Sequence, residues 1–349
     1  MNFASDNWAG AHPAIAEALA VQSAGFATAY GQSELDRAVE RHFCELFERE
    51  VAVFFVATGT AANALSMAFL NRPGGVAFGH TNAHMLEDEG GAPEHLTGGA
   101  RMHPVPGALG RMDARALEAA IHLFPAAFVH AGQPMAVSLT QATEIGTVYS
   151  LDDIETIATV CRAHGLPLHM DGARFANALA ALGTTPAEMT WKRGVEVLSF
   201  GATKNGCWCA EAVVIMDPAR AGDMHFLRKR AAHLFSKSRF IAAQFDAYFR
   251  DELWLKNARH ANEMAARLAR TVRNAGGLRL AWEPQANEVF AIMKTETADA
   301  LKRKEVFFHP WTMPDGSGTH LAPDERLYRF VTSFATTPEE IDRFGEMLG

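Results

Sequence analysis

The chain has 349 residues, of which 48% are hydrophobic, and its formal net charge is −8 at pH 7. This length allows roughly two domains, and an acidic chain without a long block of like charge argues against nucleic acid or an anionic membrane as the main partner. The longest apolar run, residues 51–57, is far too short to span a bilayer.

Short apolar runs alternate with helical patterns in the first two thirds of the chain. The predicted strands cover residues 51–57, 75–79, 126–130, 166–170, 195–200 and 211–216. A helix is predicted between Ser150, which can cap its start, and Gly165, which ends it. Strands that alternate with helices predict an α/β fold, with a mostly parallel sheet covered by helices on both faces.

The last third of the chain has a different pattern. Residues 218–275 are typical of long helices, Gly276 and Gly277 break that pattern, and short strands are predicted at 279–282, 288–293 and 327–333. A final helix begins at Thr337-Pro338-Glu339-Glu340, which has the spacing of a capping box with proline at the first helical position. We therefore expect a large domain over residues 1–248 and a smaller C-terminal α+β domain over residues 249–349.

Two side chains at consecutive strand ends carry the most specific chemical signal. Asp171 ends one apolar run, and Lys204 follows the next, 204 − 171 = 33 residues later. A lysine amine can form a Schiff base with an aldehyde cofactor, and an aspartate can keep a pyridine nitrogen protonated. Each residue alone could be an ordinary surface group. Because open α/β sheets bind ligands at the carboxyl ends of their strands, the pair predicts pyridoxal 5′-phosphate (PLP).

Three weaker patterns are compatible with that cofactor. The predicted strand-to-helix turn at Gly59, Thr60 and Ala61 offers free backbone N–H groups to a phosphate, although such turns are also common connectors. His84 can stack on a pyridine ring or transfer protons, or it is an ordinary histidine. Arg329 lies inside an apolar alternation, where it either binds an anion such as a substrate carboxylate or extends its charge into solvent from an edge strand.

Together these motifs resemble the low-specificity L-threonine aldolases, within the threonine aldolase and β-eliminating lyase group of fold-type-I PLP enzymes. The resemblance covers nearly the whole chain and is most specific at Met170-Asp171-Gly172-Ala173-Arg174 and Thr203-Lys204-Asn205. Supporting motifs are Ser5-Asp6-Asn7, Tyr30-Gly31, Gly59-Thr60-Ala61-Ala62-Asn63, Ala83-His84, Glu89-Gly90-Gly91-Ala92-Pro93-Glu94 and Tyr328-Arg329-Phe330. The resemblance implies retro-aldol cleavage of L-β-hydroxy-α-amino acids (threonine, allo-threonine or phenylserine) to glycine and an aldehyde.

The same resemblance implies a role for each site residue. The catalytic residues would be Lys204, which holds PLP as a Schiff base, Asp171, which pairs with the pyridine nitrogen, and His84, which stacks on the ring. The other cofactor-binding residues would be Gly59, Thr60, Ala61, Arg174 and Arg239. The substrate-binding residues would be Ser5, Tyr30, Arg174 and Arg329. The family builds its sites at a dimer interface inside a homotetramer, and Arg239 matches the segment that reaches the neighbour's phosphate.

Two departures from the family pattern affect the substrate. Many members carry Thr-His-Asn and then Gly-Gly after the fifth strand, and that histidine lies near the substrate hydroxyl. Here Thr143 stands at that position, which leaves His84 or a bound water as the base, and Glu144 or His84 as the source of stereochemical control. The usual glycine-rich run before the neighbour-reaching arginine is replaced by residues 234–238.

These departures predict a broad substrate range. A site without a hydrogen-bond partner for the β-hydroxyl distinguishes poorly between its two configurations, so we expect activity on both β-isomers. The aromatic residues Trp8, Phe26 and Trp208 predict a pocket wall that favours phenylserine at least as well as threonine.

Two other functions and the compartment complete the expectations. A PLP-dependent β-eliminating lyase or racemase would use the same scaffold, and a catalytically silent PLP-binding regulatory protein is a third reading. The Cys207-Trp208-Cys209 motif has no second Cys or His pair at zinc spacing, so no metal is expected. Asp6 and Asn7 precede any apolar segment, so we expect no signal peptide and a reduced, cytoplasmic compartment.

Overall fold

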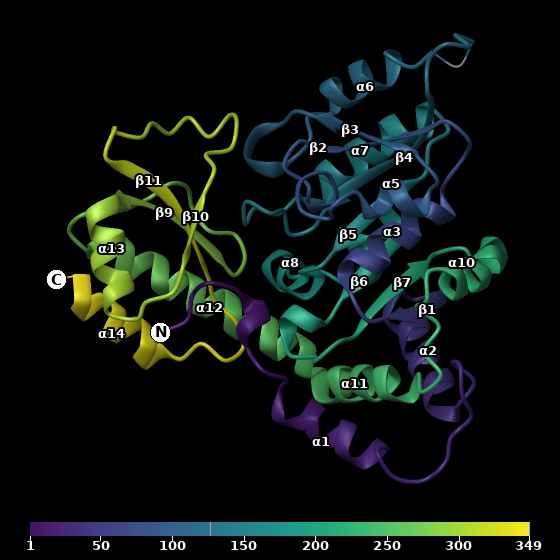
Figure 1. The fold of residues 1–349 in the computed structure, drawn as a ribbon, viewed down its shortest axis with the longest axis horizontal. Helices are drawn as coiled ribbons and strands as arrows, with labels where there is room; N and C mark the ends of the chain where they lie inside the picture. Colours follow the sequence, from purple (N-terminus) through teal and green to yellow (C-terminus); the bar gives the residue numbers. More distant parts are fainter. Residues whose placement is uncertain (126, 349) are drawn as a thin grey trace.

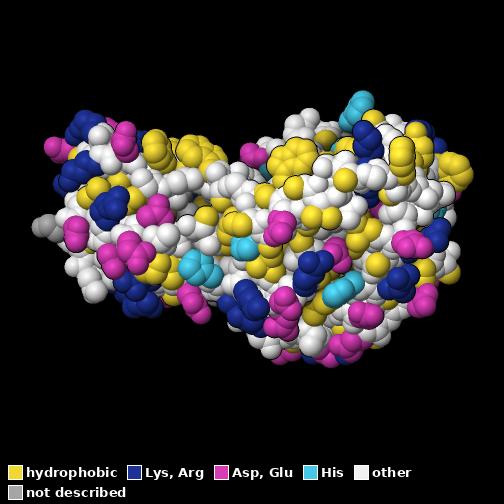
Figure 2. Space-filling view, turned by 90° about the horizontal axis from the view of Figure 1, so that it is seen from below, with side chains coloured by type: hydrophobic (Ala, Val, Ile, Leu, Met, Phe, Trp, Pro, Cys, Tyr) yellow, Lys and Arg dark blue, Asp and Glu magenta, His cyan; other side chains and the backbone are white. Residues whose placement is uncertain are grey.

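The computed structural model describes residues 1–125 and 127–348. The chain forms two lobes of unequal size, and helix α12 (Leu253–Asn274) runs between them (Figure 1). The surface is hollowed where the lobes meet (Figure 2). The larger lobe contains a seven-stranded sheet and the smaller lobe a four-stranded one.

The larger sheet has the strand order β1-β7-β6-β5-β4-β2-β3. Its strands are β1 (Ala52–Val56), β2 (Gly75–His80), β3 (Arg101–Val105), β4 (Gln133–Thr140), β5 (Leu168–Gly172), β6 (Val195–Gly201) and β7 (Glu211–Ile215). All neighbours pair in parallel except β7, which is antiparallel to both β6 and β1. The predicted mostly parallel sheet is therefore confirmed.

Helices cover the larger sheet on both faces (Figure 1). They are α1 (Pro13–Gln22), α2 (Glu34–Leu46), α3 (Gly59–Phe69), α4 (His84–Glu87), α5 (Ala92–Leu96), α6 (Ala114–His122), α7 (Leu151–Ala163), α8 (Phe175–Leu182), α9 (Pro186–Met189), α10 (Met224–Arg230) and α11 (Arg239–Phe249). The start of α7 is a capping box, in which Ser150 and Asp153 exchange side chain-to-backbone hydrogen bonds of 3.1 Å. Gly165 follows its end with φ +64°, so the predicted start and stop of this helix are confirmed.

The strand predicted at 126–130 is wrong. Residue 126 lies outside the described residues, 127–130 lie in an irregular segment with turns, and the side chains of Phe128 and Val129 are exposed. The strand is β4, seven residues further on, where Pro134 near its start made the pattern look unlike a strand. Strand β3 was not predicted, because it is a polar edge strand interrupted by Pro104.

The helical stretch predicted over 218–275 is also interrupted. Helices α10 and α11 are separated by residues 231–238, and α11 and α12 by a turn in which Asp251 and Glu252 have φ of +52° and +55°. A helix cannot continue through left-handed residues, so three shorter helices replace the expected long ones.

The smaller lobe is an antiparallel sheet of order β10-β11-β9-β8 with two helices. Its elements are β8 (Leu278–Leu280), β9 (Glu288–Lys294), α13 (Thr295–Arg303), β10 (His309–Trp311), β11 (Glu325–Val331) and α14 (Pro338–Leu348). The capping box predicted at the start of α14 is confirmed by the reciprocal bonds of Thr337 and Glu340. Its core includes Phe3, which is fully buried against Phe330 and Phe344, so the chain starts in the smaller lobe.

The domain boundary near residue 248 stays a prediction. It falls in the last turn of α11, and the following helix α12 contributes side chains to the cores of both lobes. Across the described ranges, no helix combines the length and apolarity that crossing a membrane requires.

Candidate active site

The ends of β5 and β6 bring the two most specific residues together. Asp171 is the penultimate residue of β5, and Lys204 lies in the short 3₁₀ turn Thr203–Asn205 directly after β6. The strands are parallel neighbours, so both residues lie at the carboxyl edge of the sheet. Both line a cavity of about 260 Å³. The other lining residues include Asn7, Gly59, Thr60, Asn63, His84, Glu89 and Glu211.

The start of α3 forms one end of this cavity. The Thr58 side chain caps the helix by accepting from the Ala61 N–H at 3.1 Å, and Gly59 and Thr60 line the cavity. A Cβ built on Gly59 would meet no atom within 4 Å, so the space above this helix end is open. A helix start with free N–H groups binds phosphate well. Ala61 is buried, does not line the cavity and uses its N–H in the cap.

A chain of hydrogen bonds links His84 to Asp171. Glu89 Oε1 lies 2.9 Å from His84 Nδ1 and accepts from Asn63 Nδ2 at 2.8 Å. The same Asn63 Nδ2 donates to Asp171 Oδ2 at 2.9 Å, and Asp171 Oδ1 accepts from the Ala173 N–H at 3.1 Å. The network therefore sets the orientation of the imidazole and of the carboxylate at the same time.

Electrostatics in the cavity follow from burial and this network. The hydrogen bond to Glu89 raises the pKa of His84, which favours the protonated ring. Burial, assisted by the charge of Glu144, raises the pKa of Asp171. Burial also raises the pKa of Glu211 to about 7. A cationic pyridine nitrogen beside Asp171 would supply the positive partner that this buried carboxylate lacks.

The residues present fit a pyridine ring that carries a phosphate and an aldehyde. The cavity has a helix start for the phosphate, a lysine for the aldehyde and an aspartate for the ring nitrogen. Asn63 Oδ1 and Glu89 Oε2 are buried without a hydrogen-bond partner, which leaves polar atoms for a ligand. Sequence reasoning included Asn63 only as a member of a motif and missed Glu211, because the convergence of these residues on one cavity depends on the fold.

A second cluster of charges lies where the larger sheet meets the smaller lobe. Arg174 donates to Asp6 through Nε at 2.8 Å and Nη2 at 3.1 Å, and its Nη2 lies 3.4 Å from Glu288 Oε1. Arg329 Nη1 lies 3.5 Å from the same Glu288 oxygen, and the Arg329 guanidinium stacks over Trp311 at 4.1 Å. The cluster therefore joins the N-terminal segment, the start of α8, β9 and β11.

The two arginines differ in what they have left to bind. Arg174 is engaged by Asp6 in bidentate fashion and keeps only Nη1 without a hydrogen bond among the described residues. Arg329 has one long contact, and its Nε is buried with no partner. Burial raises the pKa of Glu288 to about 6, despite the two arginines nearby. Arg329 therefore has more N–H groups free to bind a carboxylate than Arg174 has.

The remaining predicted residues lie in two places. The Ser5 Oγ caps the turn Asp6–Trp8 by accepting from the Asn7 N–H at 3.1 Å, and this turn packs against the turn that carries Lys204. Tyr30 and Arg239 do not line the cavity of their own chain. The Tyr30 N–H donates to the Ser236 carbonyl at 3.1 Å, and Arg239 Nη1 donates to the Gly25 carbonyl at 3.3 Å.

The expected aromatic wall is not formed within one chain. Trp8, Phe26 and Trp208 are all largely exposed, and none of them lines the cavity. Trp8 instead stands beside Phe307 of the smaller lobe, with ring centroids 6.0 Å apart. A substrate-range preference based on these residues stays a prediction.

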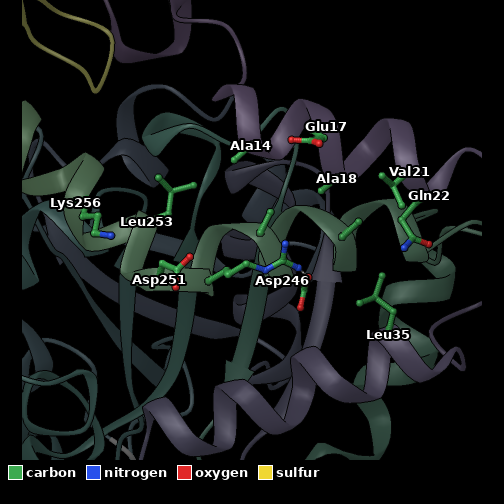
Figure 3. A pocket seen from close by; sticks show the side chains of 13 residues that line it. Ala14, Glu17, Ala18, Val21, Gln22, Leu35, Asp246, Asp251, Leu253 and Lys256 are labelled. Atoms are coloured by element: carbon green, nitrogen blue, oxygen red, sulfur yellow. Dashed lines mark hydrogen bonds and ion pairs between the residues drawn. The ribbon is translucent and has the colours of Figure 1, made fainter.

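A larger cavity of about 440 Å³ lies between α1 and α11 (Figure 3). Its lining combines small apolar side chains of both helices with surface charges such as Glu17 and Lys256, and its Arg250 is paired with Asp246 at 2.5 Å. No lysine or aspartate at a strand end reaches it. Size alone therefore does not identify the reactive site, and the chemistry favours the smaller cavity.

The chain is similar to known proteins over nearly its whole length. The model of the β-eliminating lyase family matches residues 2–296. A low-specificity L-threonine aldolase of Pseudomonas aeruginosa is 36% identical over 339 residues, which cover 97% of this chain and 94% of that protein. An enzyme of the same name from a Pseudomonas species is 38% identical over 90% of both chains. The structure of Leishmania major threonine aldolase superposes with a TM-score of 0.91 at 29% identity, covering 99% of this chain and 98% of that one.

Proposed function

The chain belongs to the β-eliminating lyase family, and we propose that it is a PLP-dependent lyase that cleaves L-β-hydroxy-α-amino acids to glycine and an aldehyde. The observation that carries this proposal is the convergence of Lys204, Asp171 and the start of α3 on one cavity. The similarity to named threonine aldolases over nearly the whole chain supports the choice of substrate class.

The polar residues named above would each have a task in this reaction. PLP, when bound, supplies a ring that accepts the electrons of the breaking Cα–Cβ bond. Lys204 Nζ would hold PLP through its aldehyde carbon. Asp171, whose carboxylate Asn63 orients, would keep a proton on the ring nitrogen. His84, whose ring Glu89 orients, would pack against the cofactor ring.

The charges beyond the cavity orient the substrate. Arg329, with its free Nε, holds the carboxylate, and Arg174 contributes the Nη1 that Asp6 leaves unused. Fixing both the amino group and the carboxylate leaves one rotation about Cα. That rotation decides which bond stands perpendicular to the ring, where its electrons can enter the ring system.

The exposed face around the start of α11 supports a proposal of self-association. The Gly31 N–H donates to Ser238 Oγ at 2.7 Å, so the loop of residues 23–32 is tied to the segment before α11. Phe26 is fully exposed on this loop, beside Arg239 in an open hollow. A second copy that covers Phe26 would bring its Arg239 to the neighbour's phosphate site, in a dimer that forms half of a homotetramer. Phe26→Asp should shift the mass in light scattering toward smaller species.

A panel of four substrates tests the function directly. The threo and erythro isomers of threonine and phenylserine are incubated with the PLP-loaded enzyme, and glycine and aldehyde are quantified. We expect both products from both isomers. A visible absorption band that borohydride bleaches would show the bound cofactor independently of turnover.

Other outcomes identify the alternatives. Keto acid and ammonia from serine would indicate β-elimination, and inversion at Cα would indicate racemisation. A bleachable band without any product would indicate a silent PLP-binding protein. A preference above a hundredfold for one β-isomer of threonine, with phenylserine inert, would contradict the broad substrate range.

A further inference from the structure

The loop after β4 carries a glutamate and starts at the strand end next to Asp171. Thr140, the last residue of β4, pairs with Asp171 in the sheet, and the Gln141 N–H donates to the Asp171 carbonyl at 2.8 Å. Glu144 follows three residues later. Its backbone is therefore attached to the strand end that carries Asp171.

Internal hydrogen bonds hold this loop in one shape. The Gln141 side chain accepts from the Tyr149 N–H at 3.0 Å and donates to the Tyr149 carbonyl at 2.9 Å. The Thr143 and Thr147 hydroxyls lie 2.8 Å apart. These bonds close the loop on both sides of Glu144, so its position is determined before any substrate binds.

The smaller lobe holds the same loop from the other side. Trp282 Nε1 donates to the Ile145 carbonyl at 3.0 Å, and Gln285 Oε1 accepts from the Val148 N–H at 2.6 Å. A Cβ on Gly146 would come within 3.0 Å of Glu288 Cβ, so the loop packs tightly on β9. Glu144 thus belongs to a loop at the junction of the two lobes, and its charge interacts with Lys204 and with both arginines of the second cluster.

The Glu144 carboxylate has no protein partner. The residue is 6% exposed, yet neither oxygen makes a hydrogen bond or a salt bridge with any described residue. Neither oxygen is completely enclosed, in contrast to Oε2 of Glu89 and of Glu288. Buried carboxylates are normally hydrogen-bonded, so this group has acceptor capacity for a ligand.

The charges around Glu144 keep it ionised. Burial alone would raise the pKa of Glu144, but the positive groups that face it lower the pKa overall. The positive groups are Lys204, Arg174, His84 and Arg329, and the negative ones are Asp171 and Glu288. An ionised carboxylate only accepts hydrogen bonds, so a hydroxyl beside it must point its proton toward it.

The other candidates near the hydroxyl are already committed. His84 Nδ1 is bonded to Glu89, and that bond raises the pKa of His84, so the ring favours its protonated, donating form. The Thr143 hydroxyl is bonded to Thr147. Glu144 does not line the cofactor cavity, but its carboxylate lacks a hydrogen-bond partner among the described residues, and its charge interacts with both Lys204 and Arg329, which we assign to the substrate amino group and carboxylate.

We propose that Glu144 is the catalytic residue that accepts the β-hydroxyl proton of the substrate during carbon–carbon cleavage, and this inference rests on the proposed aldolase function. The O–H electron pair becomes the second bond of the aldehyde carbonyl as the Cα–Cβ bond breaks. The electrons of that bond remain with the glycine fragment. One proton leaves the hydroxyl and one is added at Cα, so the step needs no oxidant or further reactant.

The test compares two reactions of the same PLP-loaded enzyme in Glu144→Gln. Cleavage of threonine requires a base at the hydroxyl, whereas exchange of the glycine α-proton with deuterium, followed by NMR, does not. We expect cleavage to fall about 10²–10⁴-fold while exchange changes less than about threefold. Glu144→Asp should restore part of the cleavage rate.

Binding and stability measurements exclude an indirect effect. The PLP dissociation constant and the thermal midpoint of Glu144→Gln should stay close to those of the parent. In calorimetry, the parent should prefer 3-hydroxybutyrate to butyrate, and Glu144→Ala should lose that preference. Glu288→Gln is the comparison variant, because Glu288 is another buried glutamate of the same cluster but contacts Arg174 and Arg329. Because it acts through the arginines and not at the hydroxyl, any loss that it causes should be equal in the two reactions.

The contrary outcomes are distinct. Parent-like cleavage in Glu144→Gln, or an equal loss of cleavage and exchange, would overturn the assignment. The same split in a His84→Gln variant, with Glu144→Gln unaffected, would transfer the role to His84. Failure of the parent enzyme to release glycine from any β-hydroxy amino acid would instead refute the proposed function.

Discussion

The site has two halves that are stabilised in different ways. The cofactor side, made of Asn63, His84, Glu89, Asp171 and Lys204, comes from the larger lobe alone, and short hydrogen bonds connect four of its members. On the substrate side, Asp6, Arg174, Glu288 and Arg329 join both lobes through ion pairs of 2.8 to 3.5 Å, and Glu144 remains unpaired among the described residues. One half is thus a network within a single sheet edge, and the other is an assembly between lobes.

The comparison shows that the number of partners an arginine already has indicates whether it stabilises the fold or is free to bind a substrate. On the substrate side, Arg174 is nearly saturated by carboxylates of its own chain, whereas Arg329 retains free donors. A buried charge that is fully paired contributes to the fold, and one that is partly paired is available to a ligand. The two arginines should therefore respond differently to the same substitution.

The largest expected effect concerns the centre of the cofactor side. Lys204→Ala should lower turnover by several orders of magnitude, because the covalent route to the cofactor is gone. Peptide mapping after borohydride reduction should find the pyridoxyl group on Lys204. The control is Lys192→Ala, since Lys192 is a surface lysine paired with Glu48 and Glu188. A label on Lys192 or Lys237 would overturn the assignment.

The next effect tests Arg174 as scaffold. Arg174→Met should lower the free energy of unfolding by about 3–5 kcal/mol, because Asp6 and Glu288 lose their buried counter-charge. Urea unfolding of Arg174→Met and Arg329→Met gives the comparison, with the smaller loss expected for Arg329. Equal losses would mean that the two arginines do not differ in this way.

A pH measurement tests the protonation state of His169, a buried histidine on the strand that carries Asp171. His169 lies on β5 between Ser138 and Ser199, at 2.8 and 2.9 Å, and burial lowers its pKa from 6.5 to about 3. The stability that depends on neutral His169 is therefore complete above pH 6.5 and is lost as the pH falls toward 3. At pH 4.5 this loss amounts to about 3 kcal/mol. In His169→Gln, the difference in unfolding free energy between pH 7 and pH 4.5 should shrink by that amount; an unchanged difference would argue against a buried neutral imidazole.

Arg329→Lys tests the anchor. Lysine keeps the charge but loses the planar guanidinium with its paired N–H donors. The value of kcat/KM should therefore fall about 30- to 150-fold, which corresponds to about 2–3 kcal/mol of binding energy in the transition state. Cofactor affinity, followed by absorption, should not change, because Arg329 does not line the cofactor cavity. If this variant cleaves substrate like the parent, the carboxylate is held elsewhere.

The smallest expected effect concerns Asn63, whose side chain connects Glu89 to Asp171 on the cofactor side. Asn63→Ala removes the shared donor of Glu89 and Asp171, so PLP affinity should fall by about 1–2 kcal/mol, or about 5- to 30-fold. A titration of the cofactor measures this change. Asn71→Ala is the control, because the Asn71 side chain bonds only to the exposed Thr97 carbonyl. An effect of equal size in the control would disprove the specific link.

The sequence alone determined the chemistry that depends on short segments. Strand ends at Asp171 and Lys204, the capping boxes at Ser150 and Thr337, and the α/β alternation all follow from patterns a few residues long. Strands with proline or polar residues escaped that reasoning. Strand β4 was misplaced because its pairing with β2 and β5 outweighs its weak local preference.

Only the tertiary structure determined which of the charged side chains are paired with each other and which remain available to a ligand. In the sequence, Arg174 and Arg329 are equivalent candidates for the carboxylate, Asp6 is one residue of a family motif, Glu144 is one of two candidates for stereochemical control, and Glu288 is unremarkable. The fold brings Asp6 back from the N-terminus to Arg174, and it leaves Glu144 without a partner. Such pairing depends on contacts between residues more than a hundred positions apart, and the energy of a buried charge depends on those contacts and not on its neighbours in the chain.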